Sequence, residues 1–212
     1  MELIFLVILG MITTLSLPPF NLFFLNFLTF PLFFIFLIKK SNLHNNLKFF
    51  FIYGWAFGFG YFMTNLYWIS ISLTFDQNFK FLIPLTVIFI PAFLSIFYGL
   101  VTIVFMILNP KKKILSSFFI FSLIFGILEF IRGSIFTGFP WNLIVYSFSN
   151  QLELISIISI VGTYGFNLFC ISLFTSPAIF ILKDRNKDIA VCVFFLISVV
   201  ALYFYGSNYK EK

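Results

Sequence analysis

The chain has 212 residues, of which 61% are hydrophobic and 9% are charged, and its mean hydropathy is +1.09. A soluble domain of this length needs far more polar surface, so the composition excludes that class and indicates an integral membrane protein. The net charge of +6 does not indicate nucleic-acid binding, because the basic residues stand in short clusters between apolar segments.

Apolar segments recur along the whole chain at the length that crosses a membrane, about 20 helical residues for a hydrocarbon core of about 30 Å. Proline, glycine and charge clusters separate these segments. The fold class that we expect is an all-α integral membrane protein, a single transmembrane domain over 1–212 with about seven helices and no soluble domain. The expected helices cover 2–16, 22–38, 48–73, 82–108, 114–133, 162–182 and 189–206.

The basic clusters predict the topology. They lie at 39–48, 111–113 and 183–187, in the loops after the second, fourth and sixth expected helices. Because positively charged loops stay on the cytoplasmic side, this alternation places the N-terminus in the cytoplasm and the C-terminus in the periplasm of a Gram-negative cell. The first 20 residues have neither a basic start nor an A-x-A cleavage site, so we expect a retained first helix.

The segment 152–182 is too long for one simple span. A continuous helix there would extend about 46 Å at about 1.5 Å per residue, which exceeds the hydrocarbon thickness. We expect a break at Gly162 or Gly165, which leaves 152–161 as a short helix at the outer surface. Pro177 is expected to kink the spanning part.

Two charged residues, Glu129 and Arg132, stand near the outer end of the fifth expected helix. Side chains three residues apart share a helix face and can pair, and an ionisable group within a span is usually paired, inward-facing and functional. A second interpretation stays open, in which Arg132 extends to the headgroups as an anchor and Glu129 only neutralises it.

The loop that follows combines a glycine turn with Phe-Pro-Trp, and this combination favours a lipid-facing site over an ordinary interfacial tryptophan. One face of the third expected helix, which carries Gly54, Gly58 and Tyr61, could add polar contacts near its outer end. For the G-x-x-x-G motif at 54–58, internal packing is favoured over dimerisation. The expected lipid-binding or substrate-binding residues are Glu129, Arg132, Gly138, Phe139, Pro140, Trp141, Asn65 and Trp68.

No residue set in the sequence is typical of a catalytic or metal centre. The one histidine, His44, falls in a loop with two asparagines and is expected to be solvated. The cysteines Cys170 and Cys192 lie in apolar segments, which is typical of buried thiols. Within this chain we therefore expect no catalytic residue, no metal and no cofactor.

Three segments resemble the membrane portion of a known family, apolipoprotein N-acyltransferase. They are EFIRGSIFTGFPWN at 129–142, YSFSNQ at 146–151 and IVGTYGFNLF at 160–169. Weaker similarities are LSLPPFN at 15–21 and GWAFGFGYFMTNLYWISISL at 54–73. The residues that match the family's motif one by one are Glu129, Arg132, Gly133, Gly138, Phe139, Pro140 and Trp141.

The resemblance implies an enzyme of the bacterial inner membrane that transfers an acyl chain from phospholipid to the N-terminal amine of a diacylglyceryl-cysteine lipoprotein. In that family the nucleophile is a cysteine of a periplasmic nitrilase-type domain that follows the seventh helix, with a Glu-Lys-Cys arrangement and a thioester intermediate. The sequence ends at Lys212, where that domain would begin, so no catalytic residue carries over. The resemblance thus implies a truncated or split form whose loop at 129–142 holds lipid tails beneath a hydrolase domain that is missing or separate.

Two other functions stay open. The chain could act alone as a non-catalytic lipid-binding scaffold or anchor, and changes at Arg132 or Trp141 would then alter binding without affecting lipoprotein acylation. A small transporter is disfavoured, because the sequence lacks midplane charges, paired broken helices and an internal repeat. The expected partners are phospholipid, lipoprotein and the membrane itself, with no nucleic acid.

Overall fold

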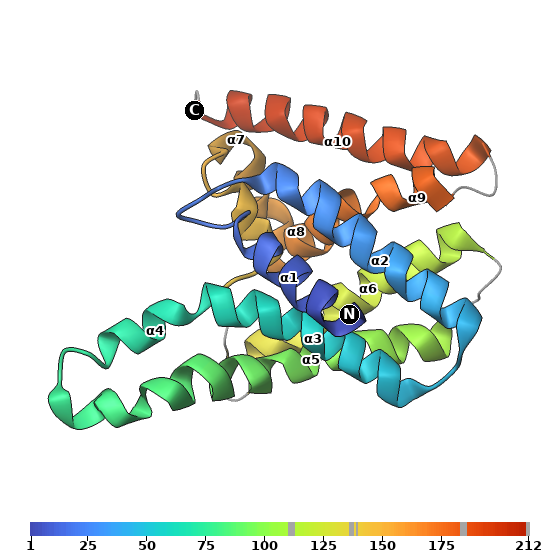
Figure 1. Ribbon diagram of the computed structural model, residues 1–212. Coiled ribbons are helices and arrows are strands. Elements are labelled where there is room, and N and C mark those ends of the chain that lie inside the picture. Colours follow the sequence, from blue (N-terminus) through green and yellow to red (C-terminus); the bar gives the residue numbers. More distant parts are fainter. Residues whose placement is uncertain (110–112, 136–137, 139, 183–185, 211–212) are drawn as a thin grey trace.

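The computed structural model describes residues 1–109, 113–135, 138, 140–182 and 186–210, and every regular element within these ranges is helical (Figure 1). The expected all-α membrane architecture is confirmed for this part of the chain. Five helical stretches in it are long and apolar enough to cross a membrane, and the helix α1 (Glu2–Thr14) is apolar but shorter. The five stretches are Phe23–Leu43, Leu85–Leu108, Ile114–Ser134, Ile158–Leu182 and Ile189–Asn208.

Glycines bring three helices of the bundle into backbone contact. The central helix α3 (Leu47–Asn65) packs along α1 on one side and along α5 (Ile90–Leu108) on the other. A Cβ atom on Gly60 would overlap the α1 backbone, and one on Gly54 would overlap the carbonyl of Tyr98 on α5. The G-x-x-x-G motif at 54–58 therefore serves packing within the chain, as expected.

Aromatic rings fill the centre of the bundle, where α2 (Asn26–Leu43), α3, α5 and α6 (Ile114–Ser134) meet. Phe33 and Phe57 stack with ring centroids 4.2 Å apart, and Tyr98 meets Phe125 edge-on at 4.9 Å. Offset and edge-to-face geometries of this kind are the favourable ones for aromatic pairs. The core is thus specified mainly by ring packing between helices.

The segment expected as one helix over 48–73 is divided in the structure. Helix α3 ends at Asn65, and the short helix α4 (Tyr67–Ser72) follows after Leu66, whose φ is −105° and ψ is 7°. Just before this point the Thr64 hydroxyl donates to the carbonyl of Gly60 at 2.8 Å. Hydroxyl groups that bond back to the helix backbone often bend helices. The sequence stays hydrophobic through this point, so the hydrophobic pattern alone predicts too long a span.

The return from α4 to α5 also departs from the expected single helix over 82–108. A 3-10 turn, η2 (Gln77–Leu82), and a π-helical turn, η3 (Leu85–Phe89), precede α5. Pro91 at the start of α5 has no N–H to donate to the preceding turn, and widened turns are typical at such positions. The elements α4, η2 and η3 form a hairpin tip that projects beyond the other helices (Figure 1).

The break expected near Gly162 is confirmed. The segment contains α7 (Leu152–Ile155) and α8 (Ile158–Thr175), and Gly162 within α8 has a φ of 73° and a ψ of 165°, which only glycine adopts readily. Pro177 begins α9 (Pro177–Leu182), and the Ser176 hydroxyl donates at 2.8 Å to the Leu173 carbonyl that the proline leaves free.

The last helix, α10 (Asn186–Lys210), lies along the outside of the bundle and contacts mainly α7 and α9 (Figure 1). At the opposite end of the bundle from α7, polar contacts join other helices. Glu2 pairs with Lys40 at 2.5 Å. The ring of His44, which was expected to be solvated, is half-buried and packs edge-on against Phe49 and Phe50.

Candidate functional site

A buried ion pair lies at the C-terminal end of α6. The side chains of Glu129 and Arg132 are 2% and 1% exposed, and the Arg132 Nη2 atom donates to Glu129 Oε2 at 2.5 Å while Nε donates to Oε1 at 3.4 Å. The guanidinium also lies over the ring of Phe62 on α3, 5.3 Å from its centroid. Since Arg132 is enclosed by protein, the pairing is confirmed and the headgroup-anchor interpretation is wrong.

Arg132 also holds the loop that follows its own helix. Its Nη1 atom donates to the carbonyl of Trp141 at 3.3 Å, and the Tyr61 hydroxyl on α3 donates to the carbonyl of Asn142 at 2.6 Å. The backbone turns sharply on both sides of these contacts, since Gly138 has a φ of 81° and Asn142 one of 61°. The loop is therefore fixed to α6 and α3 through its backbone.

Fixing the backbone in this way leaves the side chain of Trp141 on the outside. Trp141 is 58% exposed, and its ring lies 6.4 Å from that of Trp68 on α4. Pro140 beside it is exposed as well, while Phe139, which we also expected at this site, lies outside the described residues. The expected residues Trp68 and Trp141 thus meet, at the foot of the projecting hairpin.

Asn65, the other expected residue on α3, is buried and stands one helical turn after Tyr61. Its amide nitrogen has no hydrogen-bond partner in the structure. Gly138 is half-buried, and a Cβ atom there would press on the carbonyl of Gly133.

Sequence reasoning missed several aromatic residues that enclose the pair. The Tyr164 hydroxyl on α8 occupies the space above Gly133, where a side chain would collide with it, and the Tyr164 ring meets Phe130 edge-on at 5.1 Å. The Tyr98 ring on α5 stacks against that of Tyr61 at 5.9 Å, with its hydroxyl buried and unpaired. In the sequence, only Gly133 indicated such a neighbour, because a glycine at the end of a helix lets another side chain approach the backbone closely.

The other segments of the family resemblance come together at this same end of the bundle, which we call the motif end. On the 3-10 turn η4 (Ile144–Phe148), the Val145 N–H donates to the buried side-chain oxygen of Asn167 on α8 at 3.0 Å. Ser149 donates to Asn21 of the first loop at 3.2 Å. Burial raises the pKa of the Tyr146 hydroxyl, the nearby Tyr164 raises it further, and Arg132 opposes this.

The contacts at the motif end hold the backbone of the loop after α6 in place. Cys170 is fully buried in the helix core, and the Cys192 thiol donates to the Ser176 carbonyl at 3.1 Å. Among the described residues, no three His, Cys, Asp or Glu side chains are grouped so that they could hold a metal ion. The arrangement offers a rigid backbone platform with two exposed tryptophans, and such side chains suit the boundary between lipid and water.

Fold and site define a multi-pass membrane protein, and comparison with known proteins gives its family. Residues 9–176 match the family model described as "Apolipoprotein N-acyltransferase N-terminal domain". An apolipoprotein N-acyltransferase of Brucella melitensis is 34% identical over an alignment of 179 residues, which covers 80% of this chain and 33% of that relative. That of Rhodopseudomonas palustris is 34% identical over 182 residues, with 84% and 33% covered.

In other relatives the similarity covers more of the chain. The apolipoprotein N-acyltransferase of Sinorhizobium medicae is 32% identical over an alignment of 206 residues, which covers 92% of this chain and 38% of that relative. This chain belongs to the apolipoprotein N-acyltransferase N-terminal domain family, which confirms the resemblance found in the sequence. It spans about a third of the length of the curated relatives it matches.

Proposed function

We propose that this chain is the membrane domain of an apolipoprotein N-acyltransferase, which transfers an acyl chain from phospholipid to the N-terminal amine of a diacylglyceryl-cysteine lipoprotein. The family match supports the proposal, because the curated relatives carry this name. The acyl transfer itself belongs to a nitrilase-type hydrolase domain outside these 212 residues, in the same polypeptide or in a separate partner.

The proposal includes a topology in the bacterial inner membrane. The chain is one transmembrane domain that crosses seven times, with α1 and α3 as crossings in addition to the five longer stretches. The N-terminus faces the cytoplasm, and the motif end faces the periplasm, where the hydrolase domain docks. The basic loop at 39–48 and the tryptophans at the motif end support this orientation.

In this proposal the motif end is the floor of the acyl-transfer site. The observation that carries it is the buried Glu129–Arg132 pair, which holds the Trp141 carbonyl and so keeps the Trp141 ring exposed beside Trp68. Glu129, Arg132 and Gly138 shape the loop, while Trp68, Pro140 and Trp141 contact lipid tails. Phe139 and Asn65 complete the lipid-binding set.

The first experiment is to determine the size of the native product in its own membranes, by immunoblot with an antibody against the loop 39–48. A band far above 24.7 kDa places the segment within a longer acyltransferase. A band at 24.7 kDa requires a separate hydrolase, which should co-purify with the chain in mild detergent.

The second experiment is to assay the same membranes for acyl transfer from phosphatidylethanolamine to a diacylglyceryl-cysteine peptide, with mass spectrometry of the peptide. Acylation of its amine is the expected result. Membranes that contain the protein and bind the peptide without acylating it would contradict the proposal and favour the non-catalytic lipid-binding scaffold.

A further inference from the structure

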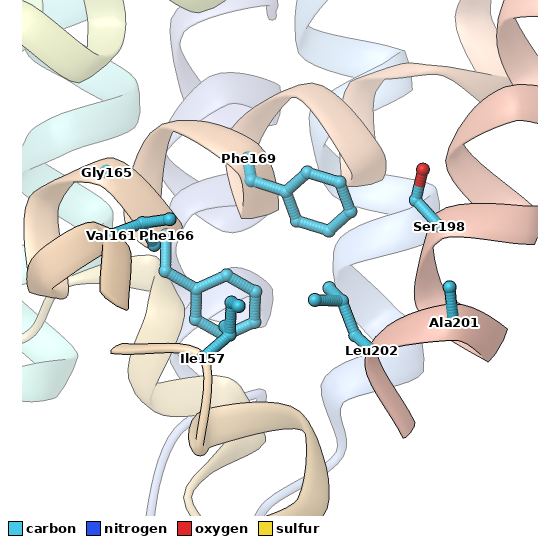
Figure 2. A pocket seen from close by; sticks show the side chains of 8 residues that line it. All are labelled: Ile157, Val161, Gly165, Phe166, Phe169, Ser198, Ala201 and Leu202. Atoms are coloured by element: carbon cyan, nitrogen blue, oxygen red, sulfur yellow. The ribbon is translucent and has the colours of Figure 1, made fainter. Parts of the chain in front are cut away.

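A second lipid-facing feature lies between α8 and α10, on a different face of α8 from Tyr164. It is a partly open cavity of about 400 Å³, and Figure 2 shows the side chains that surround it. Phe166 and Phe169 enter it from α8, and Ala201 and Leu202 face them from α10. The full lining is Ile157, Val161, Gly165, Phe166, Phe169, Ser198, Ala201 and Leu202.

Contacts at both ends keep the two helices apart at this cavity. Toward the start of α10, Phe195 packs against Phe169 with ring centroids 5.6 Å apart. Toward its end, Gly206 lies directly against the Glu153 carbonyl of α7. Between these contacts the lining includes three small residues, Gly165 on α8 and Ser198 and Ala201 on α10, and the space beside them stays open.

The α8 side of the cavity depends on one glycine. A Cβ atom on Gly165 would meet only the Val161 side chain, at 3.5 Å and 3.7 Å, so the space beside it is empty. Tyr164 and Leu168 of the same helix point elsewhere, toward Gly133 and Gly126 of α6. Helix α8 therefore contributes two faces: Tyr164 and Leu168 pack against α6, and a different face lines the cavity.

The chemistry of the lining restricts the occupant to a hydrocarbon. Every lining side chain is apolar except Ser198, and its hydroxyl is already bonded to the Phe194 carbonyl at 2.8 Å. Water needs several polar partners in a cavity, and the lining side chains offer only the oxygen of this one hydroxyl. An empty cavity would forfeit dispersion contacts along its whole lining.

The surroundings supply such a hydrocarbon. Both walls belong to candidate membrane spans, and α10 is the least buried of the five, with 11% of its most apolar window enclosed by protein. The open side of the cavity therefore faces lipid tails when the helices cross a membrane.

We propose that this cavity is a binding site for one acyl chain of a membrane phospholipid, which wedges between α8 and α10 and fastens α10 to the bundle. The site is separate from the proposed acyl-transfer floor, and the inference does not depend on that function. Since the lining offers no charged group, the cavity recognises the acyl chain of the lipid and not its headgroup.

The test is native mass spectrometry of the whole protein, purified in detergent with added dioleoylphosphatidylglycerol. The wild-type protein should keep one lipid at detergent concentrations that remove the rest. Gly165→Phe and Ala201→Phe fill the cavity from opposite walls and should each lower the lipid-bound fraction by roughly tenfold, because each displaced methylene weakens binding severalfold.

Val200→Phe is the matched control, since Val200 is the neighbour of Ala201 but is exposed and does not line the cavity. It adds the same ring to α10 and should leave lipid retention unchanged. Circular dichroism checks that each variant is folded. If one filling variant does not fold, the other, on a different helix, still tests the proposal. Equal lipid retention in the wild type and in the folded filling variants would overturn the proposal.

Discussion

The guanidinium of Arg132 contacts the Glu129 carboxylate, the Trp141 carbonyl and the Phe62 ring at once. At this residue scale, a charge in an apolar bundle is tolerable only because each side of it meets a partner. The pair shapes the loop, and the loop presents Trp141. The stability of the protein and its proposed function therefore both depend on the Arg132 side chain. Substitutions have to distinguish a loss of stability from a loss of function.

Removing one partner should destabilise the protein much more than removing both. We expect Arg132→Ala to cost about 3–5 kcal/mol, because it leaves the Glu129 carboxylate buried and unpaired. The double variant Glu129→Leu with Arg132→Met replaces the pair by apolar groups of similar size and should recover most of that loss. Thermal unfolding in detergent measures both.

The double variant also tests the site. If it is as stable as the wild type and acylates lipoprotein equally well in native membranes, then the pair has no part in the proposed function. Loss of acylation at retained stability is the result that we expect, since nothing then holds the Trp141 carbonyl.

Trp141→Ala, unlike Arg132→Ala, should affect the proposed function more than the stability of the protein. Because the side chain is 58% exposed, its loss should change the free energy of unfolding by less than about 1 kcal/mol, while it removes the ring beside Trp68. We expect severalfold slower lipoprotein acylation with an unchanged Tm. Ser134→Ala, an exposed change on the last turn of α6, is the control and should affect neither quantity.

At the scale of single elements, two glycines three residues apart in α8 have different roles. Gly162 has a backbone conformation that other residues rarely adopt, so Gly162→Ala should cost about 1–3 kcal/mol although the space around it is empty. Gly165→Ala should be neutral or stabilise the helix by up to about 1 kcal/mol. Thermal unfolding of the two variants side by side checks this, and equal Tm values would contradict it.

The elements also show how far the sequence could predict the structure. Helical spans, the break at Gly162 and the Glu129–Arg132 pair follow from hydrophobicity, glycine and spacing, which are local properties. The end of α3 at Asn65 does not follow from these properties, because the sequence stays hydrophobic beyond it. At this point the Thr64 hydroxyl bonds to the helix backbone, and the hydrophobic pattern does not show this bond. Contacts such as that of Tyr164 with Gly133 join distant segments of the chain. They depend on how the helices pack, so local sequence patterns do not predict them.

At the scale of the whole molecule, the proposed topology places two exposed loop residues on opposite sides of the membrane. Leu43 at the end of α2 should be cytoplasmic, and Phe75 beyond α4 should be periplasmic. In intact spheroplasts, a membrane-impermeant maleimide should label Phe75→Cys at once and Leu43→Cys only after lysis.

The native cysteines provide the background for this measurement. Cys170 is buried in the core and Cys192 donates its thiol proton to a carbonyl, so the unmodified protein should label weakly. Labelling of Leu43→Cys before lysis, with Phe75→Cys protected, would mean that the orientation is inverted.

The spacing of Glu129 and Arg132 within one helix bears on biogenesis. Because both charges belong to α6, they neutralise each other as soon as that helix forms, without waiting for a neighbour. The insertion machinery then receives a helix whose polar groups already satisfy one another, and partitioning into the bilayer can precede assembly of the bundle. Docking against Phe62 and capture of the Trp141 carbonyl become later steps, so maturation of the motif end follows membrane entry.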